Sequence, residues 1–387
     1  MNEHEFFLIV APGLTDLAAL ELEEKWTAIF TLAKRIAPDL TETSLQYTKT
    51  AEGITLEKVP LLAGVLLNTY LKTPTRILLR LGSFRCRDFP KLYNKCKKMN
   101  LGQWLPPGPI RIKASASKSR LMMLKRIEDT VLKACSRKAG ESEDAMLWVR
   151  FQDDTCTISV DTSGEALYKR TSEKKVGQAP LRETIAAALF YKLHLLAKED
   201  SHVFIDPMLG SGTSLSEALN FWRTHKRERY AFLSFEALQK FSIDSRLFYN
   251  QEMAKNPFDH LVGYDQNDAA LTWAKENIKS QTVVLKKRDV LGSNTNLSDV
   301  PQAGVLFANP PYGKRLKLPV APKIYFQSLW EAIARDFSPN IAGLILPREN
   351  CKSIEVQHPY KQAAVLHFMN GGLKVSFVIY RKASQIR

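Results

Sequence analysis

Short apolar runs that each end in a polar residue recur through the second half of the chain, with helical periodicity between them. Short buried strands that alternate with helices predict a mostly parallel α/β sheet, in which the carboxyl ends of the strands meet at one edge. The runs cover 202–206, 261–265, 283–289 and 304–309 and end in Asp206, Asp265, Asp289 and Asn309, and further strands are expected over 341–346, 364–369 and 374–380. Helices are expected from 179, over 214–220 and over about 269–279.

The spacing of these strand ends also predicts an insertion. Asp206 and Asp265 are 59 positions apart, which is too long for one helix and its loops. We therefore expect some 30 inserted residues within the charged and aromatic stretch 221–259.

The pattern over 70–138 is different and predicts a mixture of helices and strands. Residues 76–80 and 110–114 have the pattern of strands, and 88–99 has an apolar helical face opposite several lysines. The polar loop 115–120 is expected to cap a helix over 121–138.

Charge is concentrated in this same segment. The 387 residues have a formal net charge of +15, and 70–138 alone hold 18 Lys and Arg against 3 acids. This surplus, with Ser-Lys-Ser-Arg before a helix, suits phosphate binding better than a merely solvated basic face. No strongly amphipathic basic helix with Trp or Phe anchors supports a lipid surface. The expected phosphate contacts are Lys113, Lys118, Arg120, Lys125 and Arg126.

Composition excludes several other classes. With 45% hydrophobic residues the chain can form a core, and no run approaches the length of a membrane helix. The five cysteines and seven histidines lack metal-ligand spacing, so we expect reduced, mostly buried thiols and no metal. The acidic N-terminus is unlike a signal peptide, which favours a cytoplasmic protein.

Two motifs at the strand ends carry the expected chemistry. Asp206 begins the glycine-rich turn DPMLGSGT, which lacks the lysine of a triphosphate-binding loop. In Asn309-Pro-Pro-Tyr312 the prolines fix the backbone, so that the Asn309 side chain and the Pro310 carbonyl can accept hydrogen bonds from one exocyclic amine. Tyr312 offers a ring that can stack on the base.

At these residues the chain resembles class I S-adenosylmethionine-dependent methyltransferases, specifically the THUMP-containing guanine-N2 RNA methyltransferases. The likeness extends over 85–89, 115–121, 167–170 and 179–183, and to Arg315-Leu316. It departs at Arg170-Thr171-Ser172-Glu173, where the family commonly has Arg-Gly-Tyr-Arg, and at Leu209, where the family has Cys.

The resemblance implies a domain order. It places a ferredoxin-like α+β subdomain over 1–65, a THUMP RNA-binding domain over 66–162, a linker over 163–185 and a Rossmann-like methyltransferase domain with a mixed, mostly parallel sheet over 186–387.

The resemblance also implies the roles of the site residues. S-adenosylmethionine is the expected cofactor, with its ribose on Asp265 and its adenine amine on Asp289. Its methionine part is expected on the turn, through Asp206, Pro207, Gly210, Ser211, Gly212 and Thr213 and beside Asn309. Asn309, Pro310 and Tyr312 would hold a flipped guanine, with no general base.

The target is expected to be 23S rRNA, with tRNA as a close alternative because both readings share these motifs. A DNA adenine-N6 methyltransferase also uses Asn-Pro-Pro-Tyr but would not need the basic segment. An RNA-binding protein with an inactive methyltransferase fold remains the non-enzyme alternative.

Overall fold

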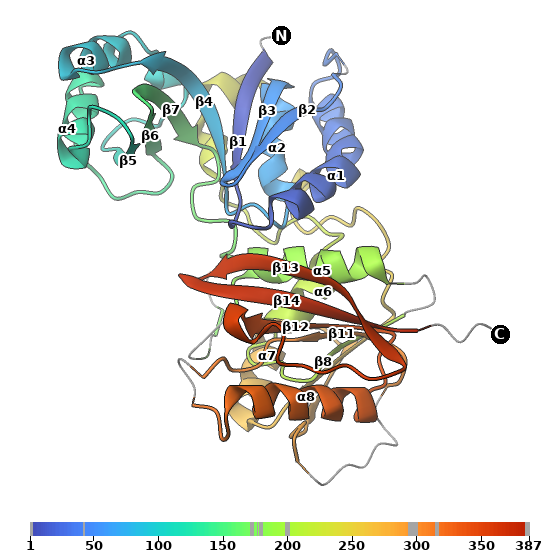
Figure 1. The fold of residues 1–387 in the computed structure, drawn as a ribbon. Helices are drawn as coiled ribbons and strands as arrows, with labels where there is room; N and C mark the ends of the chain where they lie inside the picture. The colour runs from blue at the N-terminus through green and yellow to red at the C-terminus, as the bar shows by residue number, and fades with distance from the viewer. Residues whose placement is uncertain are drawn as a thin grey trace. The chain divides into compact units, whose positions relative to one another are not determined.

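The chain forms two compact units in the computed structural model, which describes residues 3–41, 43–170, 174–175, 177, 181–197, 202–292, 301–313 and 317–383 (Figure 1). The first unit contains 1–10, 19–170 and 224–251, and the second contains 11–18, 171–223 and 252–387. Each unit is built on its own seven-stranded sheet.

The sheet of the first unit has the strand order β2-β3-β1-β4-β7-β6-β5. Its strands are β1 (Glu3–Ile9), β2 (Gln46–Thr50), β3 (Gly53–Pro60), β4 (Arg76–Arg85), β5 (Arg111–Ser117), β6 (Met146–Gln152) and β7 (Thr155–Asp161). Its helices are α1 (Thr15–Ile36), α2 (Leu61–Tyr70), α3 (Phe89–Lys97) and α4 (Leu124–Ala134), with the short 3₁₀ helices η1 (Leu101–Gln103), η2 (Ala231–Ser234), η3 (Glu236–Phe241) and η4 (Ser245–Leu247). Figure 1 shows α3 and α4 side by side near β5.

The elements β1-α1-β2-β3-α2-β4 have the order of a ferredoxin-like fold and extend to Arg85, beyond the predicted range 1–65. The boundary expected at 65/66, however, lies inside α2, and the one at 185/186 lies inside α5 (Glu183–Leu196). Because β4 pairs with β1 and also with β7, one sheet runs through both of the expected N-terminal subdomains.

The helix after the Ser-Lys loop begins later than expected. The alternating pattern continues as β5 to Ser117, which pairs with Gln152, so the serines at 115 and 117 lie in a strand and do not cap a helix. Helix α4 begins at Leu124, and its N-cap residue Met123 makes no side-chain cap. Helix α3 has a polar cap, because Asp88 accepts a hydrogen bond from Lys91 N at 2.8 Å.

The sheet of the second unit has the order β10-β9-β8-β11-β12-β14-β13 and is parallel except at β14. Its strands are β8 (Val203–Asp206), β9 (His260–Asp265), β10 (Val283–Lys287), β11 (Val305–Ala308), β12 (Ile341–Pro347), β13 (Tyr360–Asn370) and β14 (Leu373–Lys382). Its helices are α5, α6 (Thr213–Asn220), α7 (Asp268–Ile278) and α8 (Pro322–Asp336), with η5 (Arg348–Asn350). This confirms the expected mixed, mostly parallel α/β sheet.

Helices cover both faces of this sheet. Helix α8 packs through Phe326, Leu329 and Ile333 on a core that includes Leu306 and Leu344. Helices α5 and α6 lie on the opposite face (Figure 1). Burying both faces explains why the central strands read as continuous apolar runs rather than alternating ones.

The predicted insertion is present, and it belongs to the first unit. Residues 224–251 leave the chain of the second unit and pack within the first. His225 donates its backbone N–H to Thr69 O at 2.9 Å, and Phe235 contacts Trp104 with ring centroids 5.9 Å apart. Burial lowers the pKa of His225, so its ring is neutral where Nε2 contacts Leu71 O at 2.8 Å.

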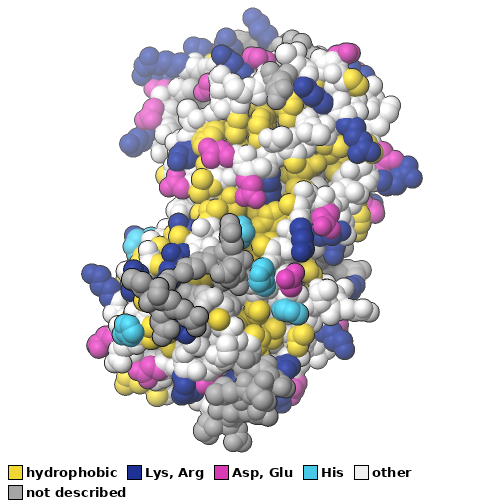
Figure 2. All heavy atoms as spheres, turned by 90° about the vertical axis from the view of Figure 1, so that its right-hand side faces the viewer, with side chains coloured by type: hydrophobic (Ala, Val, Ile, Leu, Met, Phe, Trp, Pro, Cys, Tyr) yellow, Lys and Arg dark blue, Asp and Glu magenta, His cyan; other side chains and the backbone are white. Residues whose placement is uncertain are grey.

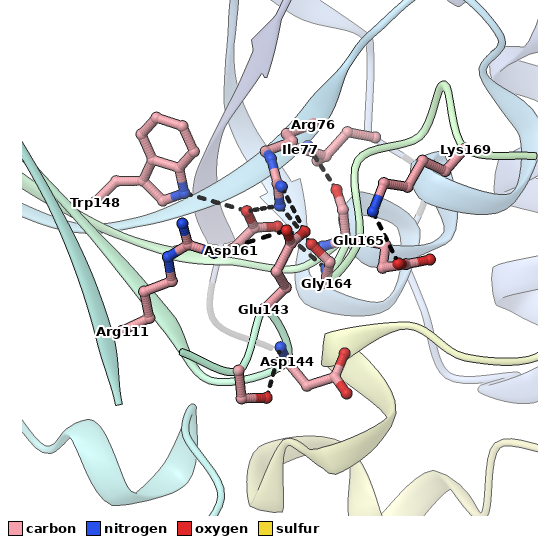
Figure 3. Close-up of polar contacts among 12 residues, drawn as sticks. Arg76, Ile77, Arg111, Glu143, Asp144, Trp148, Asp161, Gly164, Glu165 and Lys169 are labelled. Atoms are coloured by element: carbon pink, nitrogen blue, oxygen red, sulfur yellow. Dashed lines mark hydrogen bonds and ion pairs between the residues drawn. The ribbon is translucent and has the colours of Figure 1, made fainter. Parts of the chain in front are cut away.

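A buried polar network lies at the end of β7, where the chain leaves the first sheet (Figure 3). Asp161 is fully buried and accepts hydrogen bonds from Arg76 Nη1 at 2.7 Å and Trp148 Nε1 at 3.1 Å. Arg76 also pairs with Glu143 at 2.7 Å and donates to Gly164 O. Burial raises the pKa of Asp161, while the charge of Arg76 opposes that shift.

The cysteines carry free thiols, as expected. Cys86, Cys96 and Cys156 are buried, and Cys135 and Cys351 are half-buried. Burial raises the pKa of Cys96 to about 12 and that of Cys135 to about 11, so both thiols stay protonated near neutral pH. In the described part of the chain no helix is long and apolar enough to cross a membrane, and no group of His, Cys, Asp and Glu is arranged to hold a metal.

Candidate active site

The strand order of the second sheet reverses between β8 and β11, which are neighbours although the chain visits β9 and β10 between them. Leu306 of β11 lies opposite Ile205 of β8 in parallel register. In open α/β sheets, ligands bind in the crevice at such a reversal, beyond the carboxyl ends of the strands. Asp206 ends β8 and Asn309 follows β11, so both lie at this point.

The register extends the same edge to the other two predicted residues. Asp206 lies opposite Gly263, two positions before Asp265, and Asp265 lies opposite Lys287, two positions before Asp289. The four residues therefore follow four neighbouring parallel strands in the order Asp289, Asp265, Asp206 and Asn309 across the sheet. The structure brings together the strand ends that the sequence pattern placed at one edge.

The glycine loop, residues 207–213, connects β8 to α6. Gly210 and Gly212 have φ values of +54° and +84°, which glycine adopts with little strain. A Cβ at Gly212 would lie 2.9 Å from Ile278 Cδ1, whereas a Cβ at Gly210 would have nothing within 4 Å. Gly212 thus allows the loop to pack against α7, and Gly210 borders open space.

Asp206 supports the shape of this loop. The carboxylate is buried, and its two oxygens accept hydrogen bonds from Met208 N at 3.0 Å and from the Ser214 hydroxyl. Burial raises the pKa of Asp206 to about 7, the two hydrogen bonds oppose the shift, and the nearby charge of Asp265 adds to it. Near neutral pH the group is therefore partly protonated.

Asp265 ties the glycine loop to the neighbouring strand. Its Oδ2 accepts a hydrogen bond from Gly210 N at 2.9 Å, and its Oδ1 accepts one from Asn267 N at 2.9 Å. A carboxylate oxygen has two lone pairs, so both oxygens can still accept from a ribose diol. Asp289 is exposed and accepts from Leu291 N at 3.0 Å.

A hydrogen bond joins the first and last residues of the Asn309-Pro-Pro-Tyr312 turn. Asn309 and Tyr312 are half-buried, Pro310 is buried, and the Tyr312 hydroxyl donates to Asn309 Oδ1 at 2.6 Å. Burial raises the pKa of Tyr312, so the hydroxyl keeps its proton. The sequence predicts that the Tyr312 ring stacks on a base, but it does not predict this bond to the acceptor beside it.

Other site residues escaped the sequence analysis. The Lys174 side chain packs against the glycine loop. Its Nζ donates to Thr213 Oγ1 at 2.7 Å and contacts Glu183 at the start of α5. Asn277 of α7 donates to Ser211 O at 2.9 Å. No local signal marks Lys174 or Asn277, because their partners are brought to them by the fold. Thr171, Ser172, Glu173, Ala179, Pro180, Arg315 and Leu316, which entered the sequence comparison, lie outside the described residues.

Two of the expected phosphate contacts line one cavity in the first unit. The cavity has a volume of about 520 Å³ and is lined by Arg87, Lys118, Ser119, Arg120, Met122 and Asp154. Asp154 holds its walls together, accepting from Arg87 Nε at 2.5 Å and from Arg120 N at 2.8 Å. Arg87 is the lining cation that the sequence analysis did not select.

The other expected contacts lie outside this lining. Lys113 of β5 sits 4.3 Å from the centre of the Trp148 ring, Lys125 pairs with Asp129 at 3.3 Å, and the Arg126 guanidinium stacks 4.2 Å from the Phe89 ring. On the face drawn in Figure 2, acidic side chains are interspersed among basic ones. The excess of basic residues therefore does not form one continuous positive surface on that face.

Comparison with known proteins agrees with this geometry. The model of a family described as "RMKL-like, methyltransferase domain" matches residues 170–375. The chain belongs to this family. The match covers both β8 with its glycine loop and the Asn309 turn after β11.

The individual relatives and solved structures share a quarter or less of the aligned residues with this chain. "Putative RNA methyltransferase YpsC" of Bacillus subtilis (strain 168) is 25% identical over 81% of this chain and 84% of its own. "Ribosomal RNA large subunit methyltransferase K/L" of Acinetobacter baumannii (strain AYE) is 24% identical over 68% of this chain, and the match spans 38% of that protein. The fold matches the crystal structure titled "SMU.472, a putative methyltransferase complexed with SAH", at a TM-score of 0.74 with 20% identity over 100% of both chains.

Proposed function

We propose that this family member is an S-adenosylmethionine-dependent RNA methyltransferase that methylates N2 of a guanine, with 23S rRNA as the target. The observation that carries the proposal is the position of Asn309-Pro-Pro-Tyr312 directly across the strand reversal from the glycine loop. An amine held by the turn would face a methyl donor held by the loop. The name of the Acinetobacter relative supports rRNA, and that of the Bacillus relative supports RNA.

The residues of the glycine loop and of the neighbouring strand ends fit this donor. Gly210 borders open space, Asp265 keeps acceptor capacity for a ribose diol, and the exposed Asp289 can accept from an adenine amine. The bound donor supplies an electrophilic methyl group on a sulfonium. The acidic strand ends suit its positive charge.

The turn after β11 positions the target amine. Asn309 Oδ1 and the Pro310 carbonyl accept the two N2 hydrogens, which fixes the direction of the nitrogen lone pair. The Tyr312 ring stacks on the base, which must leave its helix to reach this edge. Alignment of two reactants supplies about 7–11 kcal/mol of a barrier, so the proposal needs no general base.

The basic segment of the first unit docks the RNA. Lys118, Arg120 and Arg87 converge on one cavity whose cationic side chains suit phosphate oxygens. This contact sets the distance between the docked RNA helix and the base to be modified. It does not itself recognise the base.

Two measurements test the proposal. In a deletion strain, nucleoside mass spectrometry of rRNA, tRNA and DNA should show the loss of one N2-methylguanosine, which maps to 23S rRNA. Loss from tRNA alone would favour the tRNA alternative, and loss of N6-methyladenine from DNA would overturn the RNA assignment. In vitro, Asn309→Ala should abolish methyl transfer while binding of S-adenosylhomocysteine, followed by calorimetry, is largely kept. A fully active Asn309→Ala enzyme would refute the role of the turn.

A further inference from the structure

The segment before α5 is fastened to the glycine loop by one side chain. Asn277 Oδ1 accepts from Lys175 N at 2.9 Å, and its Nδ2 donates to Lys175 O at 2.7 Å and to Ser211 O at 2.9 Å. A single amide thus joins the backbone at 175 to the backbone at 211. All of these residues lie in the second unit.

This fastening places the neighbouring lysine against the loop. Lys174 Nζ donates to Thr213 Oγ1 at 2.7 Å and pairs with Glu183. The two charged side chains are only 16% and 12% exposed. Partial burial of an ammonium is costly unless it is paired, and Glu183 provides that pairing.

Lys174 retains capacity for another acceptor. An ammonium group has three donors, and the contacts with Thr213 and Glu183 account for two of them among the described residues. The ammonium lies where the glycine loop passes into α6, beyond the acidic strand ends that suit the adenosine half of the donor.

The chemistry of the donor requires such a cation. On the proposed function, the glycine loop holds the methionine end of S-adenosylmethionine, which carries a carboxylate. The carboxylate of Asp265, which contacts the loop at Gly210, repels that group, so a positive charge on the loop favours its binding. We propose that Lys174 binds the carboxylate of the methionine part, and that Glu183 is the positioning residue that holds the lysine in place.

The adjacent Lys175 provides a matched control. It has the same charge and lies in the same segment, but its side chain is 54% exposed and pairs with Glu276 of α7. Replacing it removes one positive charge next to Lys174 without removing the contact with Thr213. Long-range effects of net charge are therefore the same in both variants.

The experiment compares two ligands that differ only in the amino-acid portion. Calorimetry of the full chain measures the dissociation constants of S-adenosylhomocysteine and of 5′-methylthioadenosine, which lacks both carboxylate and ammonium. Lys174→Met should raise the dissociation constant of S-adenosylhomocysteine about tenfold or more, which corresponds to about 1.4 kcal/mol. The dissociation constant of 5′-methylthioadenosine should not change. Lys174→Arg should recover part of the loss, and Lys175→Met should bind both ligands like wild type.

Comparing the two ligands also distinguishes a misfolded variant, a wrong assignment of Lys174 and a wrong proposed function. Unchanged binding of 5′-methylthioadenosine shows that the variant is folded at the loop. If Lys174→Met weakened the binding of both ligands equally, or changed the binding of neither, the assignment of Lys174 would be overturned and the proposed function would stand. A wild-type chain that binds neither ligand would overturn the proposed function and this inference together.

Discussion

The Tyr312 hydroxyl donates to Asn309 Oδ1 at 2.6 Å, so the tyrosine of the turn occupies the acceptor proposed to receive the substrate amine. The bond spans three positions along the chain and lies beside the buried Pro310. A carbonyl oxygen can accept two hydrogen bonds, and on the proposed function the Tyr312 ring also stacks on the incoming base. On that function, the Tyr312 hydroxyl competes with the substrate amine for Asn309 Oδ1.

Removing the hydroxyl should separate the two roles of Tyr312. Tyr312→Phe keeps the ring and frees Asn309 Oδ1, so kcat/KM should be equal to wild type or rise by up to roughly fivefold, the equivalent of about 1 kcal/mol for one hydrogen bond. Tyr312→Ala also removes stacking, worth about 1–3 kcal/mol, and should lower kcat/KM by roughly 5- to 150-fold. Steady-state kinetics on the RNA checks both. An inactive Tyr312→Phe would mean that the hydroxyl itself acts in the reaction.

Alanine at the two loop glycines should have different effects. A Cβ at Gly212 meets Ile278 at 2.9 Å in a positive-φ backbone, so Gly212→Ala should destabilise the fold by about 1–3 kcal/mol. Gly210→Ala meets no neighbour and should cost about 1 kcal/mol of stability, but its methyl group enters the space assigned to the cofactor. Denaturation midpoints and S-adenosylhomocysteine affinity measure the two effects. Equal affinity of Gly210→Ala and wild type would place the cofactor elsewhere.

The buried carboxylate of Asp206 should make stability depend on pH. Its pKa is raised from 3.8 to about 7 in the folded chain, so the folded state holds the proton more tightly than the unfolded state. Stability is therefore highest below the unfolded pKa, falls as the pH rises through this range, and is lower by roughly 4 kcal/mol above the folded pKa. Thermal unfolding at pH 5.5 and 8 should show a smaller decline for Asp206→Asn than for wild type. The same decline in both proteins would assign the effect to other groups.

The Arg76–Asp161 pair should show strong coupling. Arg76→Met leaves the carboxylate of Asp161 buried without its cation, which typically costs about 3–5 kcal/mol. Asp161→Asn keeps an acceptor for Trp148 and removes the charge, so the double variant should be more stable than Arg76→Met alone. Urea denaturation of the four proteins completes the cycle. Additive losses would show that the two side chains act independently.

RNA affinity should respond to the cavity lined by Lys118 and Arg120. Charge reversal at both positions should weaken binding about equally for unrelated RNA sequences and reduce the slope of log K against log salt by about one to two units. Lys125→Glu, at an exposed lysine outside the cavity, should have a smaller effect than Lys118→Glu alone, which changes the charge equally. Filter binding at several salt concentrations measures the slopes. Wild-type affinity in the double reversal would place the docking surface elsewhere.

The strand ends could be predicted from the sequence because local patterns determine them. Asp206, Asp265, Asp289 and Asn309 each follow an apolar run, and parallel strands necessarily bring their carboxyl ends together. The start of α4 was predicted wrongly, since a serine-rich stretch suits both a cap and the exposed face of an edge strand. Pairing of Ser117 with Gln152 decides in favour of the strand.

Contacts between distant segments could not be predicted in this way. Lys174 meets Thr213 only after the chain has folded over the glycine loop, and neither residue belongs to a periodic pattern that signals the meeting. The bond between Tyr312 and Asn309 is local but depends on a side-chain rotamer. The THUMP assignment of 66–162 and the roles of the site residues stay predictions.

The inserted segment 224–251 limits how this protein can be dissected in the laboratory. A fragment that starts after residue 170 would carry Phe232, Phe235 and Phe248 without the rest of the first unit, in which they are buried. A fragment that stops at 170 would lack them, leaving Trp104 and the carbonyls of Thr69 and Leu71 without their partners. Separate expression of either half should therefore yield insoluble material, unless the intervening loop is deleted from one piece and grafted onto the other.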